Sequence, residues 1–419
     1  MRRILTEKRK QGLEYLRSIG KWLTVALITG AIGGPLGTLF HKSVEFSNLI
    51  FDANHWLIWL LPVGGLFIVW LYAATDMLKS AGTDEVIGSV RTGQHIRLVM
   101  APLIFVSTVL THLLGGSAGR EGAALQLGGS IGVKVGKLLR LNDRDMHIIT
   151  LCGMSALFSA LFCTPMTAVF FAIEVISVGV MYYAALLPCT IASLLSYAIA
   201  LLLGAHPMHF TVEIPAVSWD VLWRTTVLAV LCAGISIVFC LAMRESHRLF
   251  KKGFANPYIR IVVGGCSIIL LTFLCGSDNY NGSGTTFVFS AVNDGVAAPA
   301  AFLWKMLFTA ITIGCGFKGG EIVPTLFIGS TFGCVAGSLL GMDPRVAAAI
   351  GMIAVFCAVV NCPVASIILS IELFGSQGLL LFAPACVISY ILSGNYGLYH
   401  EQHIMYSKLR AEYINRPVK

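Results

Sequence analysis

Apolar stretches long enough to cross the ~30 Å hydrocarbon core of a bilayer recur along the chain. Uninterrupted stretches lie near residues 22–42, 56–75, 99–114, 182–203, 224–243, 259–275 and 376–392. Others are short or broken by Gly and Pro, near residues 146–162, 165–181, 302–316, 322–340 and 346–360. Broken spans are tolerated only where they are buried in protein or line a cavity. The pattern therefore predicts an all-α, polytopic membrane protein with discontinuous helices.

The composition also indicates a membrane protein. Of 419 residues, 56% are hydrophobic and 12% are charged, whereas a soluble domain usually carries about 25% charged residues. The 43 Gly are typical of transmembrane helices that pack closely. Twelve Cys are scattered singly, with no CxxC pair and no Cys/His cluster of zinc spacing, so we interpret them as packing residues. No cofactor, metal ligand or catalytic residue is expected.

Basic residues are concentrated at the two ends of the chain. Seven Lys or Arg precede Leu23, and no convincing cleavage site follows, so residues 1–22 are predicted to form an amphipathic helix on the cytoplasmic membrane surface. Residues 401–419 form a basic tail that is too short for a CBS-type regulatory domain. The positive-inside rule places both termini in the cytoplasm. These segments explain the formal charge of +8, and no nucleic-acid partner is expected.

Two segments of the chain match each other without gaps. Residues 153–175 read GMSALFSALFCTPMTAVFFAIEV, and residues 351–373 read GMIAVFCAVVNCPVASIILSIEL. Eight of the 23 positions are identical, including the pair Glu174 and Glu372. Most of the other positions exchange one apolar residue for another.

A second matching pair precedes the first. GREGAALQLGGSIG begins at Gly119 and GGEIVPTLFIGSTFG begins at Gly319, and this alignment pairs Glu121 with Glu321. Because two motifs recur in the same order at nearly the same spacing, we predict an internal duplication. Its copies are one transmembrane repeat over 23–205 and another over 206–400. In transporters, binding sites lie near the membrane midplane where the broken helices of two repeats meet.

The first Gly-rich motif has the properties of an anion site. Gly115–Gly122 reads GGSAGREG and comes before a run with the character of a helix. Helix N-termini present free backbone N–H groups and a partial positive charge, which bind anions without a Lys or Arg in the path. Glu121 stands in this break, where a carboxylate at membrane depth is costly unless it has a function. We predict that it fills the anion's place when ionised and leaves when protonated, as gate and proton carrier.

The other acidic residues of the repeat are weaker candidates for a role in transport. Glu321 stands in the second motif and is either a second proton-handling group or the structural partner of Lys318. The alternative for Glu121 is an ion pair with Arg120. The matched Glu174 and Glu372 favour a structural role, such as capping a helix end.

Two further segments are candidates for the site. Residues 80–93 read SAGTDEVIGSVRTG, a polar break on the side inferred to be cytoplasmic, where Gly82 and Thr83 are placed to begin a helix. Near the end of the last span, residues 393–402 read SGNYGLYHEQ. Tyr396, Tyr399 and Tyr406 compete as the hydroxyl that reaches an anion, and interfacial anchoring is the alternative for each.

At these residues the sequence resembles the CLC family of chloride channels and proton-coupled anion antiporters over essentially the whole chain. GREGAALQLGGSIG is similar to the family's gating-glutamate motif, GFKGGEIVPTLFIG to its second anion-binding motif, and GLYHEQ to its central-tyrosine segment. The resemblance implies two inverted-topology repeats with tilted helices, and a homodimer with one halide and proton pathway per subunit, in a bacterial plasma membrane. It also implies the anion-binding residues Gly119, Arg120, Gly122, Ile322, Val323, Tyr399, Ala81, Gly82 and Thr83, beside Glu121 as the gate.

Several departures from the family pattern bear on coupling. SAGTDE replaces GSGIPE, so Ala81 stands where a serine hydroxyl usually helps to bind chloride. The usual internal proton glutamate is replaced by Val175, as in passive channels. However, Ala123 after GREG and Glu321 in the second motif are typical of the fluoride-exporting antiporters, although Val323 is not. The residues leave chloride and fluoride open.

Three hypotheses follow. The leading one is a halide/proton antiporter in which Glu121 and Glu321 both handle the proton. The second is a passive anion channel in which Glu321 is structural. The third, a membrane-embedded enzyme or cation carrier, lacks support because neither HExxH nor GxSxG occurs in the sequence.

Overall fold

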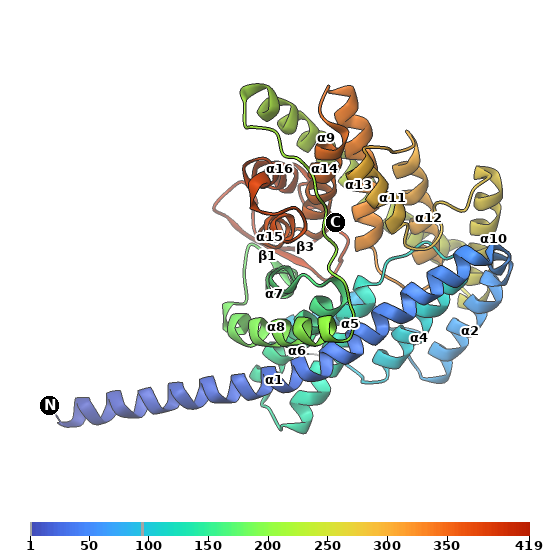
Figure 1. The fold of residues 1–419 in the computed structure, drawn as a ribbon. Coiled ribbons are helices and arrows are strands. Elements are labelled where there is room, and N and C mark those ends of the chain that lie inside the picture. The colour runs from blue at the N-terminus through green and yellow to red at the C-terminus, as the bar shows by residue number, and fades with distance from the viewer. Residues whose placement is uncertain (1, 94–95) are drawn as a thin grey trace.

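The computed structural model describes residues 2–93 and 96–419, which fold into two groups of helices joined by the linker 203–218. The first group contains α1 (Arg2–Ala53), η1 (His55–Leu60), α2 (Leu61–Ala74), α3 (Thr83–Thr92), α4 (Met100–Leu113), α5 (Glu121–Leu138), α6 (Asp143–Phe162), α7 (Pro165–Glu174), η2 (Tyr183–Ala185) and α8 (Leu186–Leu202). In Figure 1 this group runs from blue to green and fills most of the lower part of the molecule.

The second group repeats the order of the α-helices, with its short non-α helices at partly different places. It contains α9 (Trp219–Gly253), α10 (Pro257–Cys275), α11 (Thr285–Phe289), η3 (Ser290–Asp294), α12 (Ala301–Cys315), α13 (Ile322–Leu339), α14 (Pro344–Val360), α15 (Pro363–Phe374), η4 (Ser376–Gly378) and α16 (Leu379–Leu392). The helices α5, α6 and α7 therefore correspond to α13, α14 and α15. The predicted division near residue 205 falls in the linker between the groups.

Many of the helices can cross a bilayer by length and composition. Seven such helices occur in the described part of the chain: Lys10–Ala53, His55–Ala74, Asp143–Phe162, Tyr183–Leu202, Trp219–Gly253, Pro257–Cys275 and Ile322–Leu339. Shorter apolar helices, such as α7 and α15, lie among them. The predicted mixture of complete and broken spans is thus present, and the chain is an integral membrane protein.

The N-terminal helix differs from the prediction. We expected a separate surface helix over 1–22, but α1 is a single helix from Arg2 to Ala53, and residue 1 lies outside the described residues. Its first part projects from the helical body (Figure 1), and residues 10–20 are exposed. Pro35 lies inside the helix without ending it. Neither Gly12 nor Gly20 ends the helix, so the charged segment and the first span form one continuous element.

The helices α7 and α15 cap each other and thereby reveal the relation between the repeats. Glu174 at the end of α7 accepts hydrogen bonds from the backbone N–H groups of Val364 (3.2 Å) and Ala365 (2.9 Å) at the start of α15. Glu372 near the end of α15 accepts from the N–H groups of Met166 and Thr167 at the start of α7, both at 2.9 Å. Each carboxylate thus neutralises the positive end of its partner helix. Because equivalent helices run antiparallel, the repeats are inverted.

Glycine contacts set the register of the duplication. A Cβ at Gly128 would lie 2.4 Å from the carbonyl oxygen of Gly153, and a Cβ at Gly329 would lie 2.6 Å from that of Gly351. Only Gly allows helices to approach so closely, so α5 crosses α6 as α13 crosses α14. Gly128 is therefore the counterpart of Gly329. The sequence alignment paired Gly129 with Gly329 and is wrong by one residue in this motif.

The structure confirms the predicted all-α fold, and one small sheet accompanies the helices near the C-terminus. The strands β1 (Ser177–Val178), β2 (His403–Tyr406) and β3 (Tyr413–Pro417) pair in that order, β1 parallel to β2 and β2 antiparallel to β3. The tail is therefore docked on the segment that follows α7. Lys408 strengthens this docking by donating to the Tyr390 carbonyl at 2.8 Å and to Ser393 Oγ at 3.0 Å.

Candidate functional site

The two Gly-rich breaks predicted from the repeat meet directly. The N–H of Gly119 donates to the carbonyl of Gly320 at 2.6 Å, and the N–H of Gly320 donates to the carbonyl of Gly119 at 2.7 Å. This antiparallel bridge joins the residues that precede α5 and α13. Both residues are fully enclosed, and a Cβ on Gly320 would lie 2.6 Å from Glu121 Oε2. Gly is thus required where the repeats touch.

The bridge also shows that the two glutamates are not equivalent. Glu121 is the first residue of α5, whereas Glu321 is the N-cap that precedes α13. Each helix has 18 residues and its N-cap makes no side-chain capping bond. In this register the counterpart of Glu121 is Ile322, and that of Glu321 is Arg120. The prediction that the glutamates occupy the same position in each copy is therefore wrong by one residue, and they leave the backbone in different directions.

Glu121 has a fully buried carboxyl group. Its Oε2 accepts a hydrogen bond from the backbone N–H of Arg120 at 3.0 Å, and Oε1 has no hydrogen-bond partner among the described residues. The backbone N–H of Val323, in the first turn of α13, also faces this carboxyl group. The negative group of one repeat thus occupies the helix N-terminus of the other, where an anion would be stabilised.

The predicted structural partners of the glutamates are not found within the described part of the chain. No ion pair links the side chains of Glu121 and Arg120 there, and none links Glu321 to Lys318. Lys318 instead lies over the ring of Tyr72, with 4.6 Å between Nζ and the ring centroid. Glu321 is half-buried, and its Oε2 is enclosed without a hydrogen-bond partner among the described residues. Both glutamates therefore keep an oxygen free for another ligand.

Of the three candidate tyrosines, Tyr399 is the one placed beside the glutamates. Its side chain is 2% exposed, and its hydroxyl has no hydrogen-bond partner among the described residues. Glu321 and Glu121 both lie within electrostatic range of this hydroxyl. The carbonyl of Tyr396 accepts a hydrogen bond from Asn361 Nδ2 at 3.0 Å, and the ring of Tyr406 packs edge-to-face on Tyr413. Since a buried hydroxyl costs free energy without a partner, Tyr399 is suited to bind a ligand between the helix ends.

The segment that begins α3 approaches the same region. Thr83 Oγ1 donates to the carbonyl of Gly122 at 3.3 Å and accepts from Gln126 Nε2 at 3.1 Å. Gly82 has φ +65°, a conformation open to Gly, and serves as the N-cap of α3. Ala81 is exposed. The segment is therefore adjacent to the first turn of α5, but the Thr83 hydroxyl is already engaged by protein atoms.

Sequence reasoning missed two residues near this site. Gln126 fixes Thr83, and its one-turn distance from Gly122 along α5 could have identified it. Asp84, the residue after Thr83, lies within electrostatic range of both Glu321 and Tyr399. The signal for Asp84 was the SAGTDE segment itself, which was considered only as a helix start.

Comparison with known proteins agrees with this arrangement. Residues 64–394 match the family model described as voltage gated chloride channel. A chloride/fluoride channel protein from Pseudomonas syringae pv. tomato is 33% identical over 415 residues, which cover 96% of this chain and 90% of that protein. The H(+)/Cl(-) exchange transporter ClcA of Vibrio cholerae is 24% identical over 395 residues, 86% of this chain and 83% of that protein.

Solved structures have the same fold. The crystal structure of a CLC-type fluoride/proton antiporter superposes with a TM-score of 0.88 at 30% identity, covering 92% of this chain and 98% of that one. A slow cyanobacterial Cl-/H+ antiporter has a TM-score of 0.75 at 21% identity over 90% of this chain and 94% of that one, which is evidence for the fold alone. These relatives are channels and transporters rather than enzymes. The paired helix breaks, their glutamates and this similarity together establish that the chain belongs to the voltage gated chloride channel family, the CLC family.

Proposed function

We propose that this protein exchanges a halide, with fluoride favoured over chloride, for protons across a membrane. The observation that carries the proposal is the Glu121 carboxyl group, which lies at the N-terminus of a helix from the other repeat and is itself buried. A group in that position competes with an anion for the same N–H donors. It can also take up a proton, which a fixed N–H cannot.

The two helix starts and Tyr399 form the proposed anion site. The N–H groups at the starts of α5 and α13 supply partial positive charge, and the Tyr399 hydroxyl supplies a donor that has no partner among the residues that the structure describes. Ile322, Val323, Arg120 and Gly122 contribute backbone rather than side-chain donors, whereas the N–H of Gly119 is held by the Gly320 carbonyl and Gly119 only shapes the site. Binding by dipoles is strong enough to admit a halide and weak enough to release it.

The Glu121 carboxyl group is the proposed gate. When ionised, it holds the N–H donors itself and excludes the halide. When protonated, the carboxyl group is neutral and is attracted less strongly to the N–H donors. It then leaves them, and the halide binds in its place. Glu321 lies within electrostatic range of Glu121, and two nearby carboxylates disfavour being ionised together. A proton shared between them couples the movement of the gate to the movement of protons.

Support for fluoride comes from the relatives and from the donors at the inner end of the site. The Pseudomonas relative and the fluoride/proton antiporter both carry fluoride in their descriptions. In this chain Ala81 and Val323 bring no hydroxyl group, and the Thr83 hydroxyl is bound to Gly122 and Gln126. None of these three residues therefore provides a free hydroxyl in place of the serine hydroxyl that helps to bind chloride in the family.

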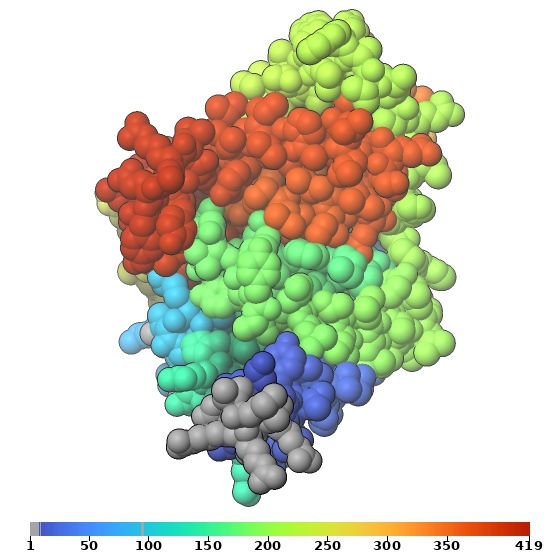
Figure 2. Space-filling model, turned by 90° about the vertical axis from the view of Figure 1, so that its left-hand side faces the viewer, coloured from blue at the N-terminus to red at the C-terminus, as the bar shows by residue number. Residues whose placement is uncertain are grey.

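The surface of the helical body supports a proposal for the assembly. The helices α8 and α16 carry exposed apolar side chains such as Leu187, Leu194, Leu380 and Val387. The green and orange-red segments that include α7, α8, α15 and α16 lie on one face in Figure 2. We propose that this face joins two copies into a homodimer with one pathway per subunit. We further propose a bacterial plasma membrane with both termini cytoplasmic, because the basic segments lie at both ends.

One flux experiment tests the function. Purified protein is reconstituted into liposomes loaded with fluoride or with chloride, and external pH is recorded while the halide flows out. The proposal predicts that protons move uphill into the liposomes as the halide leaves, with faster exchange for fluoride. Halide efflux without proton movement would instead support a passive channel.

The channel alternative rests on Val175. Its side chain is fully buried and holds no proton, and its carbonyl accepts a hydrogen bond from Gln402 Nε2 at 2.8 Å. The position used by the family's internal proton glutamate thus has a structural role here. Antiport therefore requires another inner carboxyl group.

A further inference from the structure

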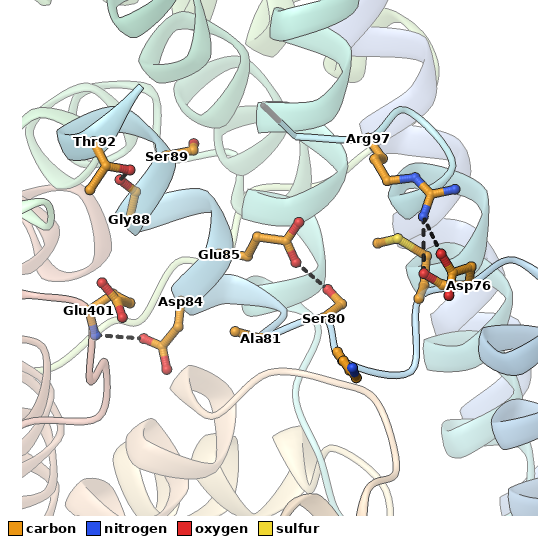
Figure 3. A pocket seen from close by; sticks show the side chains of 12 residues that line it. Asp76, Ser80, Ala81, Asp84, Glu85, Gly88, Ser89, Thr92, Arg97 and Glu401 are labelled. Atoms are coloured by element: carbon orange, nitrogen blue, oxygen red, sulfur yellow. Dashed lines mark hydrogen bonds and ion pairs between the residues drawn. The ribbon is translucent and has the colours of Figure 1, made fainter. Parts of the chain in front are cut away.

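A cavity of about 420 Å³ opens beside the start of α3, on the side of the molecule that carries the C-terminal tail. Four of its lining residues are acidic, namely Asp76, Asp84, Glu85 and Glu401, and two are basic, namely Lys79 and Arg97. Figure 3 shows Asp84 and Glu401 on one side of it and Asp76 and Arg97 on the other. The lining therefore has an excess of negative charge, which repels halides and attracts protons.

Most of these acidic groups are engaged at the rim. Asp76 is fully exposed and lies 3.8 Å from Arg97. Glu401 pairs with Arg91 at 2.9 Å. Glu85 Oε2 accepts a hydrogen bond from Ser80 Oγ at 2.5 Å. Asp84 differs, because its hydrogen bond comes from a backbone group, the N–H of Glu401 at 3.2 Å.

Asp84 stands between the cavity and the paired glutamates. It is half-buried and lines the cavity, yet it is close enough for its charge to act on Glu321 and on the Tyr399 hydroxyl. The buried Glu321 Oε2 and Tyr399 Oη lack hydrogen-bond partners among the described residues. Glu321 in turn lies within range of Glu121. Carboxyl groups thus extend from the cavity to the proposed gate.

The surroundings of Asp84 suit proton uptake. Burial raises the pKa of Asp84, while the N–H of Glu401 and the nearby His400 oppose that rise. The titratable groups that face it are Glu401 at the start of the tail, His400 and Tyr399 just before it, and Glu321 from the segment before α13. Because these effects on its pKa oppose each other, the Asp84 carboxyl group can both accept and release a proton.

We propose that Asp84 is the inner proton-transfer residue, which takes protons from water in the cavity and passes them to Glu321. In each transfer the Asp84 carboxylate gains a proton from water, becomes neutral, and returns to a carboxylate when Glu321 is protonated. Asp84 thereby performs the inner proton transfer, which the apolar side chain of Val175 cannot perform. This inference rests on the proposed antiport function.

Substitution of Asp84 is the primary test. Fluoride-driven proton uptake into liposomes is compared for the wild-type protein, Asp84→Asn, Asp84→Glu and the control Glu213→Gln in the exposed linker. We expect Asp84→Asn to slow proton uptake by roughly 100-fold, the usual effect of removing a positioned proton-transfer group. Asp84→Glu should retain uptake and steepen its decline with rising pH, and Glu213→Gln should match the wild type. A structural role for Asp84 predicts no such rescue by Glu.

The outcomes separate this inference from the proposed function. If the wild-type protein moves no protons, the antiport function is wrong. If the wild type does and folded Asp84→Asn moves them equally fast, Asp84 is not the transfer residue. Should Asp84→Asn not fold, labelling of the wild type with dicyclohexylcarbodiimide, which modifies protonated carboxyl groups, decides. Mass spectrometry should find the adduct on Asp84, declining as pH rises, and absence of that adduct at every pH would overturn the proposal.

Discussion

The two Gly-rich breaks have the same backbone but different chemistry. Both precede an 18-residue helix, and both contribute one Gly to the bridge between Gly119 and Gly320. However, the first break carries its glutamate on the first residue of the helix, and the second carries it on the N-cap. The duplication therefore supplies a symmetric frame, and a shift of one residue gives the two carboxyl groups different positions at their helix starts.

The consequence is visible in their hydrogen bonds. Each glutamate has one oxygen without a hydrogen-bond partner among the described residues, but Glu121 is fully buried and its other oxygen is held by the N–H of Arg120, whereas Glu321 is half-buried. In the function that we propose, Glu121 is in the position of a closed gate. Glu321 lies within electrostatic range of both Glu121 and Asp84, so the proposed pathway passes the proton through it.

The largest expected effect comes from Glu121→Gln. Glutamine keeps the size of the side chain but neither ionises nor releases a proton, so coupled proton flux should fall by at least about 100-fold. The measurement is fluoride-driven proton uptake into liposomes. Glu213→Gln, in the exposed linker, is the control and should behave as the wild type. Unchanged coupling in Glu121→Gln would rule out Glu121 as the proton carrier.

Gly320→Ala tests the bridge that aligns the two breaks. Its Cβ would lie 2.6 Å from Glu121 Oε2 and 2.7 Å from the backbone nitrogens of Glu121 and Gly122, and backbone atoms cannot move aside cheaply. We expect loss of transport by about tenfold or more, because a misplacement of about 1 Å can cost 100-fold. The matched control is Gly234→Ala in α9, where a Cβ meets nothing within 4 Å. Equal transport in both variants would contradict the role of the bridge.

The reciprocal caps of α7 and α15 form a symmetric pair and should respond alike. Glu174→Gln and Glu372→Gln each leave one acceptor oxygen where a carboxylate had two. Each should lower the free energy of unfolding by about 1–3 kcal/mol, seen as a lower melting temperature in detergent. Glu372→Gln should cost more, because Glu372 also accepts from Thr167 Oγ1 at 2.5 Å. Loss of proton coupling without loss of stability would assign these residues to transport instead.

The smallest effect concerns the caps of α6 and α14, Asn142 and Asp343. Each side chain accepts a backbone N–H, from Asp145 and from Arg345 respectively, both at 2.9 Å. Substitution of either by Ala should cost about 1 kcal/mol. The Arg345 side chain lowers the pKa of Asp343 in the folded protein. The contribution of Asp343 to the free energy of unfolding is therefore present above pH ~4, and it is lost as pH falls through the lowered pKa of the folded state.

Melting temperatures between pH 7 and pH 3 test whether the cap at Asp343 depends on pH and the cap at Asn142 does not. The deficit of Asp343→Ala relative to the wild type should shrink at the acidic end, by well under 1 kcal/mol because the pair is largely exposed. The deficit of Asn142→Ala should not change with pH. An identical pH dependence for both variants would exclude a charged cap at Asp343.

Hydrophobic patterning predicted most of the fold and part of the site. Spans were identifiable because lipid demands long apolar segments, and the breaks were identifiable because Gly interrupts them. The abundance of Gly also made the register of the first motif ambiguous in the sequence. Gly128 and Gly129 are adjacent, and only the contact of Gly128 with Gly153 shows which of them corresponds to Gly329. Runs of small residues tolerate a slip of one position in an alignment, but packed helices do not.

Long-range partners were beyond the reach of the sequence. Glu174 and Glu372 were recognised as structural, yet that each caps a helix of the opposite repeat depends on the fold. The pairing of β2 with a strand as short as Ser177–Val178 likewise has no local signal. Tyr399 became distinct from Tyr396 and Tyr406 only through its burial beside the glutamates.

The proton-to-fluoride ratio of Glu321→Gln tests most directly the claim that two inequivalent carboxyl groups handle the proton. Fluoride efflux and proton uptake are recorded together in liposomes for the wild type and for this variant. The account predicts that proton uptake is lost in Glu321→Gln, because no group connects Asp84 to Glu121, and that any remaining fluoride flux is uncoupled. A wild-type ratio of protons to fluoride in this variant would contradict it and make Glu321 a structural residue.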